Sequence, residues 1–145
     1  MFTAGLFASH VAPYGFDTPN LNALNQSPSW AHPFGTNLIG NDYFSRVLYG
    51  VGTEARVALL VALFGTLLGT SLGVAAGYVG GVMDESLMRL TDLCLTLPPF
   101  IVALVAAAYV GVSTALSVSL LLAALVWMPL ARIVRGTALE LREME

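Results

Sequence analysis

The sequence predicts an all-α, polytopic membrane protein, and three observations carry that prediction. Of its 145 residues, 57% are hydrophobic and only 10% are charged, against about 25% charged in ordinary soluble domains. A run of 27 residues, Val57 to Met83, and a run of 39 residues, Leu93 to Ala131, contain no charged side chain. As a helix with a rise of about 1.5 Å per residue, the second run is about twice as long as the hydrocarbon core is thick, so it has to turn back once.

The charge pattern and the reactive side chains exclude several classes of protein. The net charge is −3, and the six basic residues are arginines scattered along the chain, so we expect no nucleic-acid partner. Cys94 is the single cysteine, and neither His10 nor His32 has a partner at ligand spacing, so we expect no metal and no cofactor. The sequence carries no recognisable nucleophile motif or pair of catalytic carboxylates, so we do not expect an enzyme.

The chain before residue 57 is predicted to hold the end of a truncated transmembrane helix and one long loop. Residues 1–12 are apolar but cover only about half a span, and they lack the positive flank of a signal peptide. Residues 13–56 are rich in proline and asparagine, which favour turns and extended chain. A short amphipathic helix at residues 41–49 is expected near the end of this loop, with Asp42 in its first turn.

Residues 57–79 are predicted to form the first full span, about 35 Å long. Glycine recurs at every fourth position in this span, at Gly65, Gly69, Gly73 and Gly77. Glycines at this spacing form a groove along one side of a helix, in which a second helix can lie closely. We therefore expect helix packing at these glycines. The partner is either another helix of this chain or, in an alternative hypothesis, a second copy of a small self-associating membrane protein.

A second span is predicted at residues 88–111, with a charged stripe at its start. On helical spacing Glu85, Arg89 and Asp92 fall within about 60° of one another. Pairing among them matters because an isolated charge in the bilayer costs free energy. We interpret this polar stripe either as a functional lining or latch, or as an interfacial end of the helix. An intramembrane enzyme built on Asp84, Glu85 and Asp92 is a further alternative, and no motif supports it.

The second span is expected to be kinked, and a third span follows it. Pro98 and Pro99 remove two backbone donors, which predicts the kink. Residues 111–114 are the polar interruption of the long apolar run and are expected to form the tight turn. The third span is predicted at residues 115–133, and the charged residues 132–145 are expected to leave the membrane.

The arginines indicate how the spans are oriented. With three spans, one side of the membrane holds two arginines and the other side holds Arg89, Arg132, Arg135 and Arg142. Arginines are enriched on the cytoplasmic side of membrane proteins. We therefore expect residues 13–56 outside the membrane and the C-terminus in the cytoplasm.

A series of short motifs, in order from about residue 10 to the end, resembles one family of transport proteins. The loop carries His32-Pro33-Phe34-Gly35-Thr36-Asn37, Gly40-Asn41-Asp42, Ser45-Arg46 and Leu48-Tyr49-Gly50. Later motifs are Gly77-Tyr78-Val79-Gly80-Gly81, Asp84-Glu85, Met88-Arg89, Asp92, Pro98, Ala131-Arg132-Ile133-Val134-Arg135-Gly136 and Leu141-Arg142-Glu143. This series is similar to that of the permease subunits of ABC importers for dipeptides, oligopeptides and nickel, which are binding-protein-dependent transport components of the inner membrane.

The resemblance implies a type I permease fold in the plasma (inner) membrane and a set of partners. Two permease subunits would form the pathway, ATPase subunits would bind from the cytoplasm, and an extracytoplasmic solute-binding protein would deliver the solute. The cytoplasmic coupling loop would begin with Arg135, Gly136, Leu141, Arg142 and Glu143. The family's members are considerably longer, so the chain would correspond to the middle of one, and we do not expect it to transport alone.

Two positions depart from the family pattern. Family members usually carry Asp and Arg where this chain has Asn37 and Asn41. Two charges of the loop are therefore replaced by neutral amides, and a role that depends on those charges does not carry over.

Overall fold

The structure is a computed structural model, which describes residues 8–144, and every regular element in that part of the chain is a helix. The prediction of an all-α protein is confirmed. The chain divides after Arg56 into two compact units, residues 1–56 and residues 57–145. The truncated helix expected at residues 1–12 lies mostly outside the described residues, and α2 (Ala8–Val11) covers its last part.

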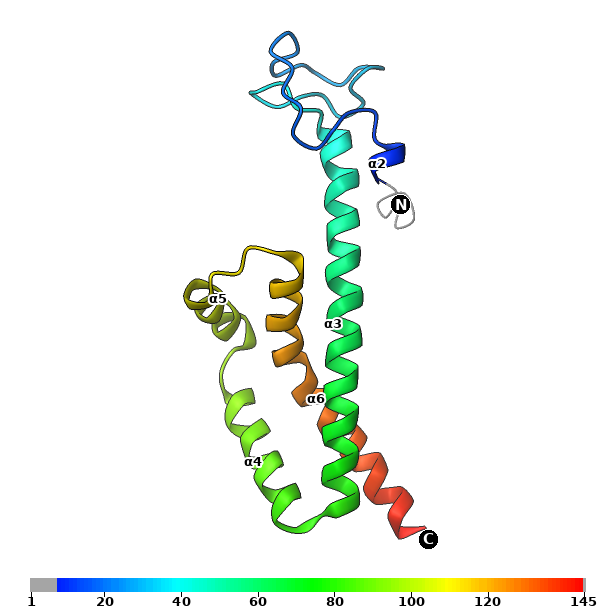
Figure 1. Cartoon of the computed structure of the whole chain (residues 1–145), viewed down its shortest axis with the longest axis vertical. Coiled ribbons are helices and arrows are strands. Elements are labelled where there is room, and N and C mark those ends of the chain that lie inside the picture. Colours follow the sequence, from blue (N-terminus) through cyan, green and yellow to red (C-terminus); the bar gives the residue numbers. More distant parts are fainter. Residues whose placement is uncertain (1–7, 145) are drawn as a thin grey trace. The chain divides into compact units, whose positions relative to one another are not determined.

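The first unit consists of α2, a long loop and the first turns of α3 (Tyr43–Val79). Figure 1 shows the loop, in blue and cyan, as irregular chain that leads into α3. Aromatic contacts hold the loop together: Phe34 packs edge-on against Phe44, and Phe16 packs edge-on against Tyr49. The Arg46 guanidinium lies over the Phe16 ring, 4.8 Å from its centroid, which adds a cation–π attraction.

α3 differs from the prediction because it is one helix of 37 residues. We expected a separate amphipathic helix at residues 41–49 and a span at residues 57–79. The segment between them contains Gly50 and Gly52 but no proline, and an interior glycine costs only about 1 kcal/mol relative to alanine. The helix therefore continues through both glycines. Its charge-free part, residues 57–79, is about 35 Å long and thus long enough to cross a bilayer.

The predicted second span, residues 88–111, is instead a pair of helices at a sharp angle. α4 (Gly81–Thr96) and α5 (Pro99–Val110) are bent by 89° at Leu97 and Pro98. Leu97 and Pro98 both adopt extended backbone angles, as expected for residues that precede proline. Pro99 occupies the first position of α5, where its missing N–H costs no hydrogen bond.

α6 (Ala115–Glu143) begins after a tight turn and contains the predicted third span. Gly111 ends α5 in the left-handed conformation, with φ at 67°, which glycine adopts without strain. Thr114 and Ser117 form a reciprocal capping box at the start of α6. The predicted span, residues 115–133, lies within this helix, which continues to Glu143 because the residues that follow the span, such as Ala138 and Leu139, are good helix formers.

Within residues 8–144, two helices, α3 and α6, are long and apolar enough to cross a membrane, and α4 with α5 makes a third if the bent pair counts as one span. Apolar side chains are exposed along these helices, for example Leu67, Phe100 and Ile133. Exposed apolar surface of this extent is typical of lipid-facing helices. The protein is therefore a multi-pass helical membrane protein.

Candidate functional site

The glycine face of α3 lies against α6. A Cβ atom added at Gly73 would lie 2.6 Å from the carbonyl oxygen of Ala131 and 2.8 Å from Cβ of Val134. A Cβ added at Gly77 would lie 2.7 Å from Cβ of Ala138. Real Cβ atoms do not approach other atoms this closely, so these two positions require glycine if the helices are to keep their separation.

The contacts also give the relative direction of the two helices. Gly65 faces Val126, and Gly69 faces Leu130, whereas Gly77 faces residues near Ala138. The partner on α6 advances along the sequence as the glycine does, so α3 and α6 are parallel. The four predicted packing glycines thus meet another helix of the same chain.

The polar stripe is only partly paired as the sequence indicated. Arg89 Nη2 lies 2.5 Å from Oε1 of Glu85, one turn away on α4. Both side chains are largely exposed, Arg89 at 75% and Glu85 at 62%. Asp92 does not pair with Arg89; it accepts a hydrogen bond from Nη2 of Arg132 on α6. The expectation that these three residues neutralise one another on one helix is therefore wrong for Asp92, because α6 supplies a second arginine.

A second pair of side chains joins α4 to α6 more tightly. Arg135 Nη2 donates to Oδ2 of Asp84 at 2.5 Å, and Nε of the same guanidinium donates to Oδ1. The Asp84 side chain is 14% exposed and the Arg135 side chain 31%. A guanidinium that donates two parallel hydrogen bonds to one carboxylate is fixed in orientation as well as attracted.

Thr91 adds a hydroxyl to this contact. It is fully buried, and its Oγ1 accepts a hydrogen bond from Nε of Arg132 at 3.2 Å and donates to the carbonyl oxygen of Met88 at 2.8 Å. Arg132 therefore has two partners on α4. Sequence reasoning missed Asp84 and Thr91 as members of this group. The available signal was two arginines three residues apart where the apolar run ends, because an arginine so close to the hydrocarbon is stabilised by a polar or acidic partner.

The other residues expected to begin a coupling loop form the last turns of α6. Gly136 has open space where a Cβ would be, and Leu141 and Arg142 are exposed. A Cβ at Gly80, the residue that follows α3, would lie 3.3 Å from Nη1 of Arg142. Glu143 is the last residue of α6. The structure thus brings Arg135 into an ion pair and leaves Leu141 and Arg142 accessible.

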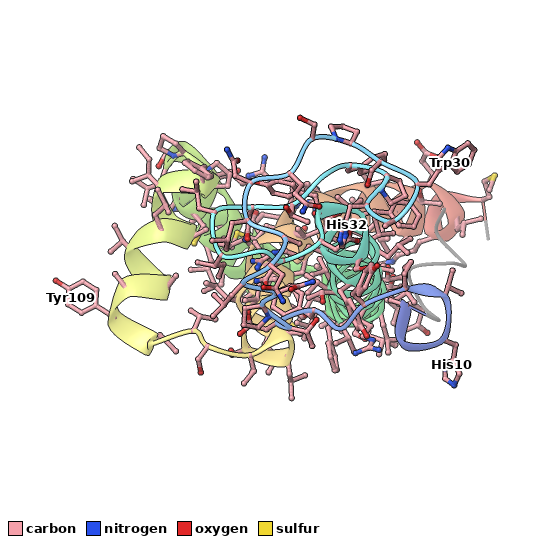
Figure 2. The ribbon with its side chains drawn as sticks, turned by 90° about the horizontal axis from the view of Figure 1, so that it is seen from above. His10, Trp30, His32 and Tyr109 are labelled. Atoms are coloured by element: carbon pink, nitrogen blue, oxygen red, sulfur yellow. The ribbon has the colours of Figure 1, made fainter. Side chains whose placement is uncertain are left out.

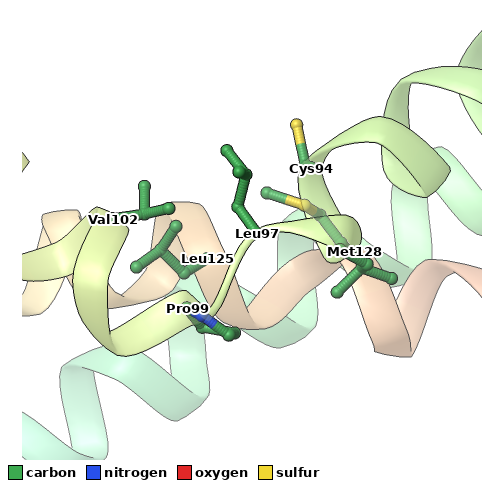
Figure 3. A pocket seen from close by; sticks show the side chains of 7 residues that line it. Cys94, Leu97, Pro99, Val102, Leu125 and Met128 are labelled. Carbon is green, nitrogen blue, oxygen red and sulfur yellow. The ribbon is translucent and has the colours of Figure 1, made fainter.

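A small apolar pocket lies at the break between α4 and α5. Its volume is about 80 Å³, and it is lined by Cys94, Leu95, Leu97, Pro99, Val102, Leu125 and Met128. Figure 3 shows Leu125 and Met128 of α6 facing the break. The lining has no charged side chain, so the pocket has no group that would hold a charged or strongly polar ligand.

The loop contains a buried polar network around Asp42. His32 Nδ1 lies 2.9 Å from Oδ1 of Asp42, and the backbone N–H of Ser45 donates to Oδ2 at 2.7 Å. Asp42 thereby caps the first turn of α3. Figure 2 shows His32 within the loop, whereas Trp30 points away from the chain. Burial raises the pKa of Asp42, but the hydrogen bonds from Ser45 and His32 outweigh it and hold that pKa below its ordinary value of 3.8.

The two asparagines that depart from the family pattern are part of the same loop. The Asn37 side chain accepts hydrogen bonds from the backbone N–H groups of Ile39 and Asn41. Asn41 is almost fully buried, and its Nδ2 donates to Oδ1 of Asp17 at 3.2 Å. Neutral amides therefore organise the turn at these positions. Within residues 8–144, no three His, Cys, Asp or Glu side chains are grouped so as to hold a metal ion.

A family model matches the second half of the chain. Residues 69–145, just over half of the sequence, match the family described as "Binding-protein-dependent transport system inner membrane component". The match covers the end of α3 and all of α4, α5 and α6.

Curated relatives extend the similarity to the loop. A putative peptide permease protein of Brucella abortus is 39% identical over 137 residues, which are 92% of this chain and 44% of the relative. The oligopeptide transport system permease protein OppC of Mycobacterium tuberculosis is 34% identical over 146 residues, 100% of this chain and 50% of the relative. The probable D,D-dipeptide transport system permease protein DdpC of Escherichia coli is 34% identical over 139 residues, 95% and 46% respectively. The chain spans about half the length of the curated relatives it matches.

Proposed function

Because the chain belongs to the family of binding-protein-dependent transport system inner membrane components, we propose that it forms part of the pathway of an ATP-driven importer of peptides. The family consists of membrane transport components, so the chain is not an enzyme. The observation that carries the proposal is the similarity to relatives named as peptide permeases over 92 to 100% of this chain.

Peptides are the solute class that these relatives support. Their names refer to peptide, oligopeptide and D,D-dipeptide transport. Nickel, which the motif resemblance also implies, is the alternative solute. It has no comparable support, because none of these three names refers to nickel.

We propose an orientation with residues 13–56 outside the membrane and the end of α6 in the cytoplasm. The arginine count supports it, because four of the six arginines then lie on the cytoplasmic side. In this orientation the loop would face an external solute-binding protein. Residues 135–143 would begin the segment that couples to the ATPase subunits, and we call them the coupling segment.

We propose that a second permease subunit completes the pathway, as membership of this family implies. ATP binding would shift the paired subunits between inward-open and outward-open states, which requires the ATPase to interact unequally with the two states. The self-associating protein considered as an alternative would need a free glycine face. That face is covered by α6, since Gly73 and Gly77 contact Ala131 and Ala138.

A chimera tests the proposed function. Residues 1–145 replace the matched half of the Mycobacterium tuberculosis OppC protein, and uptake of a radiolabelled oligopeptide is measured in cells that hold the other subunits. We expect uptake well above that of cells without the permease. Uptake at the level of those cells, with the chimera present in the membrane, would contradict the proposal.

Two controls show whether the uptake is ATP-driven and whether peptide is the solute. An ATPase subunit that cannot hydrolyse ATP should abolish uptake by the chimera. Excess unlabelled peptide should compete with the labelled peptide, whereas excess nickel should not. Competition by nickel but not by peptide would favour the alternative solute.

A further inference from the structure

We infer that Asp84 and Arg135 are positioning residues that set the direction of the coupling segment relative to α4. The inference rests on the proposed function, because it assigns residues 135–143 to ATPase coupling. It goes beyond that function by naming the contact through which a movement of the segment would reach α4 and the bent α4–α5 pair.

The geometry of the pair is suited to setting a direction. Two nitrogens of one planar guanidinium donate to the two oxygens of Asp84. Rotation of α6 by a fraction of a turn would break at least one of these hydrogen bonds, because a bidentate pair tolerates little rotation. The pair is also shielded: Asp84 is 14% exposed, compared with 62% for Glu85, the next residue on the same helix.

A second contact lies one turn earlier on α6. Arg132 donates to Thr91 and Asp92, which lie seven and eight residues after Asp84 on α4. Two arginines three residues apart therefore bind two sites about 11 Å apart along α4. One contact alone would leave α6 free to pivot about it, whereas two contacts fix its angle to α4.

The other side of α6 is held by α3. Val134 lies against Gly73, and Ala138 lies against Gly77, at distances that leave no room for a further atom. Residues 134–138 are thus held between α3 and α4, and Leu141 is exposed less than one turn later. A partner that pushes on the exposed end of α6 therefore acts on α4 through Arg135 and Asp84.

The experiment measures how firmly α6 is held relative to α4. Cysteines replace Ser86 on α4 and Glu140 on α6, both exposed, in the full chain with Cys94→Ala, and both carry spin labels. Pulsed electron paramagnetic resonance in lipid nanodiscs gives the distance distribution. We expect a narrow distribution for the parent, a clearly broader one for Arg135→Gln and Asp84→Asn, and an intermediate one for Arg135→Lys, which keeps the charge but not the two-donor geometry.

Arg89→Gln is the matched control. It removes an arginine from an ion pair on the same α4, but that pair is exposed and does not reach α6. We expect the distribution to stay narrow. Distributions for Arg135→Gln and Asp84→Asn that equal the parent's would overturn the inference, and so would equal broadening by Arg89→Gln.

A functional measurement separates positioning from mere stability. In the assembled importer, Arg135→Gln should lower the peptide taken up per ATP hydrolysed by about fivefold or more, while ATP hydrolysis itself persists. Arg135→Lys should restore part of that ratio. Parent-like coupling in Arg135→Gln would overturn the inference. A chain that shows the expected distances but no peptide uptake in its parent form would support the positioning and contradict the proposed function alone.

Discussion

His32 and Asp42 form a buried pair in the loop before α3, with Nδ1 of the histidine 2.9 Å from Oδ1 of the carboxylate. The side chains are 8% and 1% exposed. The Tyr14 ring stacks on His32 with a centroid distance of 4.9 Å, and the backbone N–H of Tyr14 donates to Oγ of Ser45. The Asp42 carboxylate therefore joins His32, which lies earlier in the loop, to the first turn of α3.

Asp42 should make the folding of the loop sensitive to acid. Its pKa is held below 3.8 in the folded loop, so the carboxylate stabilises the fold above pH 3.8. That stabilisation is lost as the pH falls through the lowered, folded pKa. The protection of the loop amides against hydrogen exchange, corrected for the intrinsic pH dependence of exchange, should fall in that acidic range. Asp42→Asn keeps an acceptor for the helix cap. In this variant the loop amides should no longer lose protection as the pH falls through the acidic range. Unchanged acid dependence in that variant would contradict the assignment.

Gly73→Ala should separate α3 from α6. The added methyl group would lie 2.6 Å from the Ala131 carbonyl oxygen, and overpacking of this kind costs about 1–3 kcal/mol. Gly65→Ala is the matched control, because the nearest atom to its Cβ is at 3.6 Å, an ordinary contact. The free energy of unfolding in detergent should fall for the first variant only. Equal losses for both would show that the glycines do not set the helix separation.

Thr91→Val should weaken the contact between α4 and α6. Valine has the shape of threonine but leaves Nε of Arg132 without its acceptor, and the loss of such a hydrogen bond costs about 1–3 kcal/mol. Thr91→Ser keeps the hydroxyl and should cost less. Thermal unfolding of the three proteins in the same detergent checks this order. A valine variant as stable as the parent would mean that Asp92 alone satisfies Arg132.

The proposed orientation predicts which side chains a membrane-impermeant maleimide reaches in intact cells. Trp30 is fully exposed in the loop, so Trp30→Cys in a Cys94→Ala background should be labelled from outside. Glu140→Cys, also at an exposed position, should be labelled only after the cells are opened. Labelling of position 140 in intact cells would contradict the proposed orientation and support the opposite one.

The apolar runs were sufficient to predict the helical class and the need for a turn within residues 93–131. Both follow from local physics, because a long charge-free stretch in a bilayer must pair its own backbone groups. Pro98 and Pro99 likewise predict a kink, since neither has a backbone N–H. The angle of 89° did not follow from the sequence, because it depends on how α5 packs against α6.

The ion pairs between different helices could not be predicted from sequence patterns. Arg89 and Asp92 share a helical face, and the sequence indicated a contact between them. Asp92 instead meets Arg132, which lies 40 residues away. Helical spacing describes neighbours on one helix, whereas the choice among several arginines depends on the packing of α4 on α6. The continuous α3 was missed for a related reason, since Asp42 does mark a helix start but Gly50 and Gly52 do not end the helix.

The closeness of Arg142 to Gly80 has an electrostatic effect on a helix other than its own. α3 ends at Val79, and the last carbonyl groups of a helix carry a partial negative charge. The guanidinium that α6 brings to this point is attracted to that charge, an interaction worth about 0.3–1 kcal/mol at low ionic strength. Salt screens it, so the end of α6 is held to the end of α3 more firmly in dilute buffer than at high ionic strength.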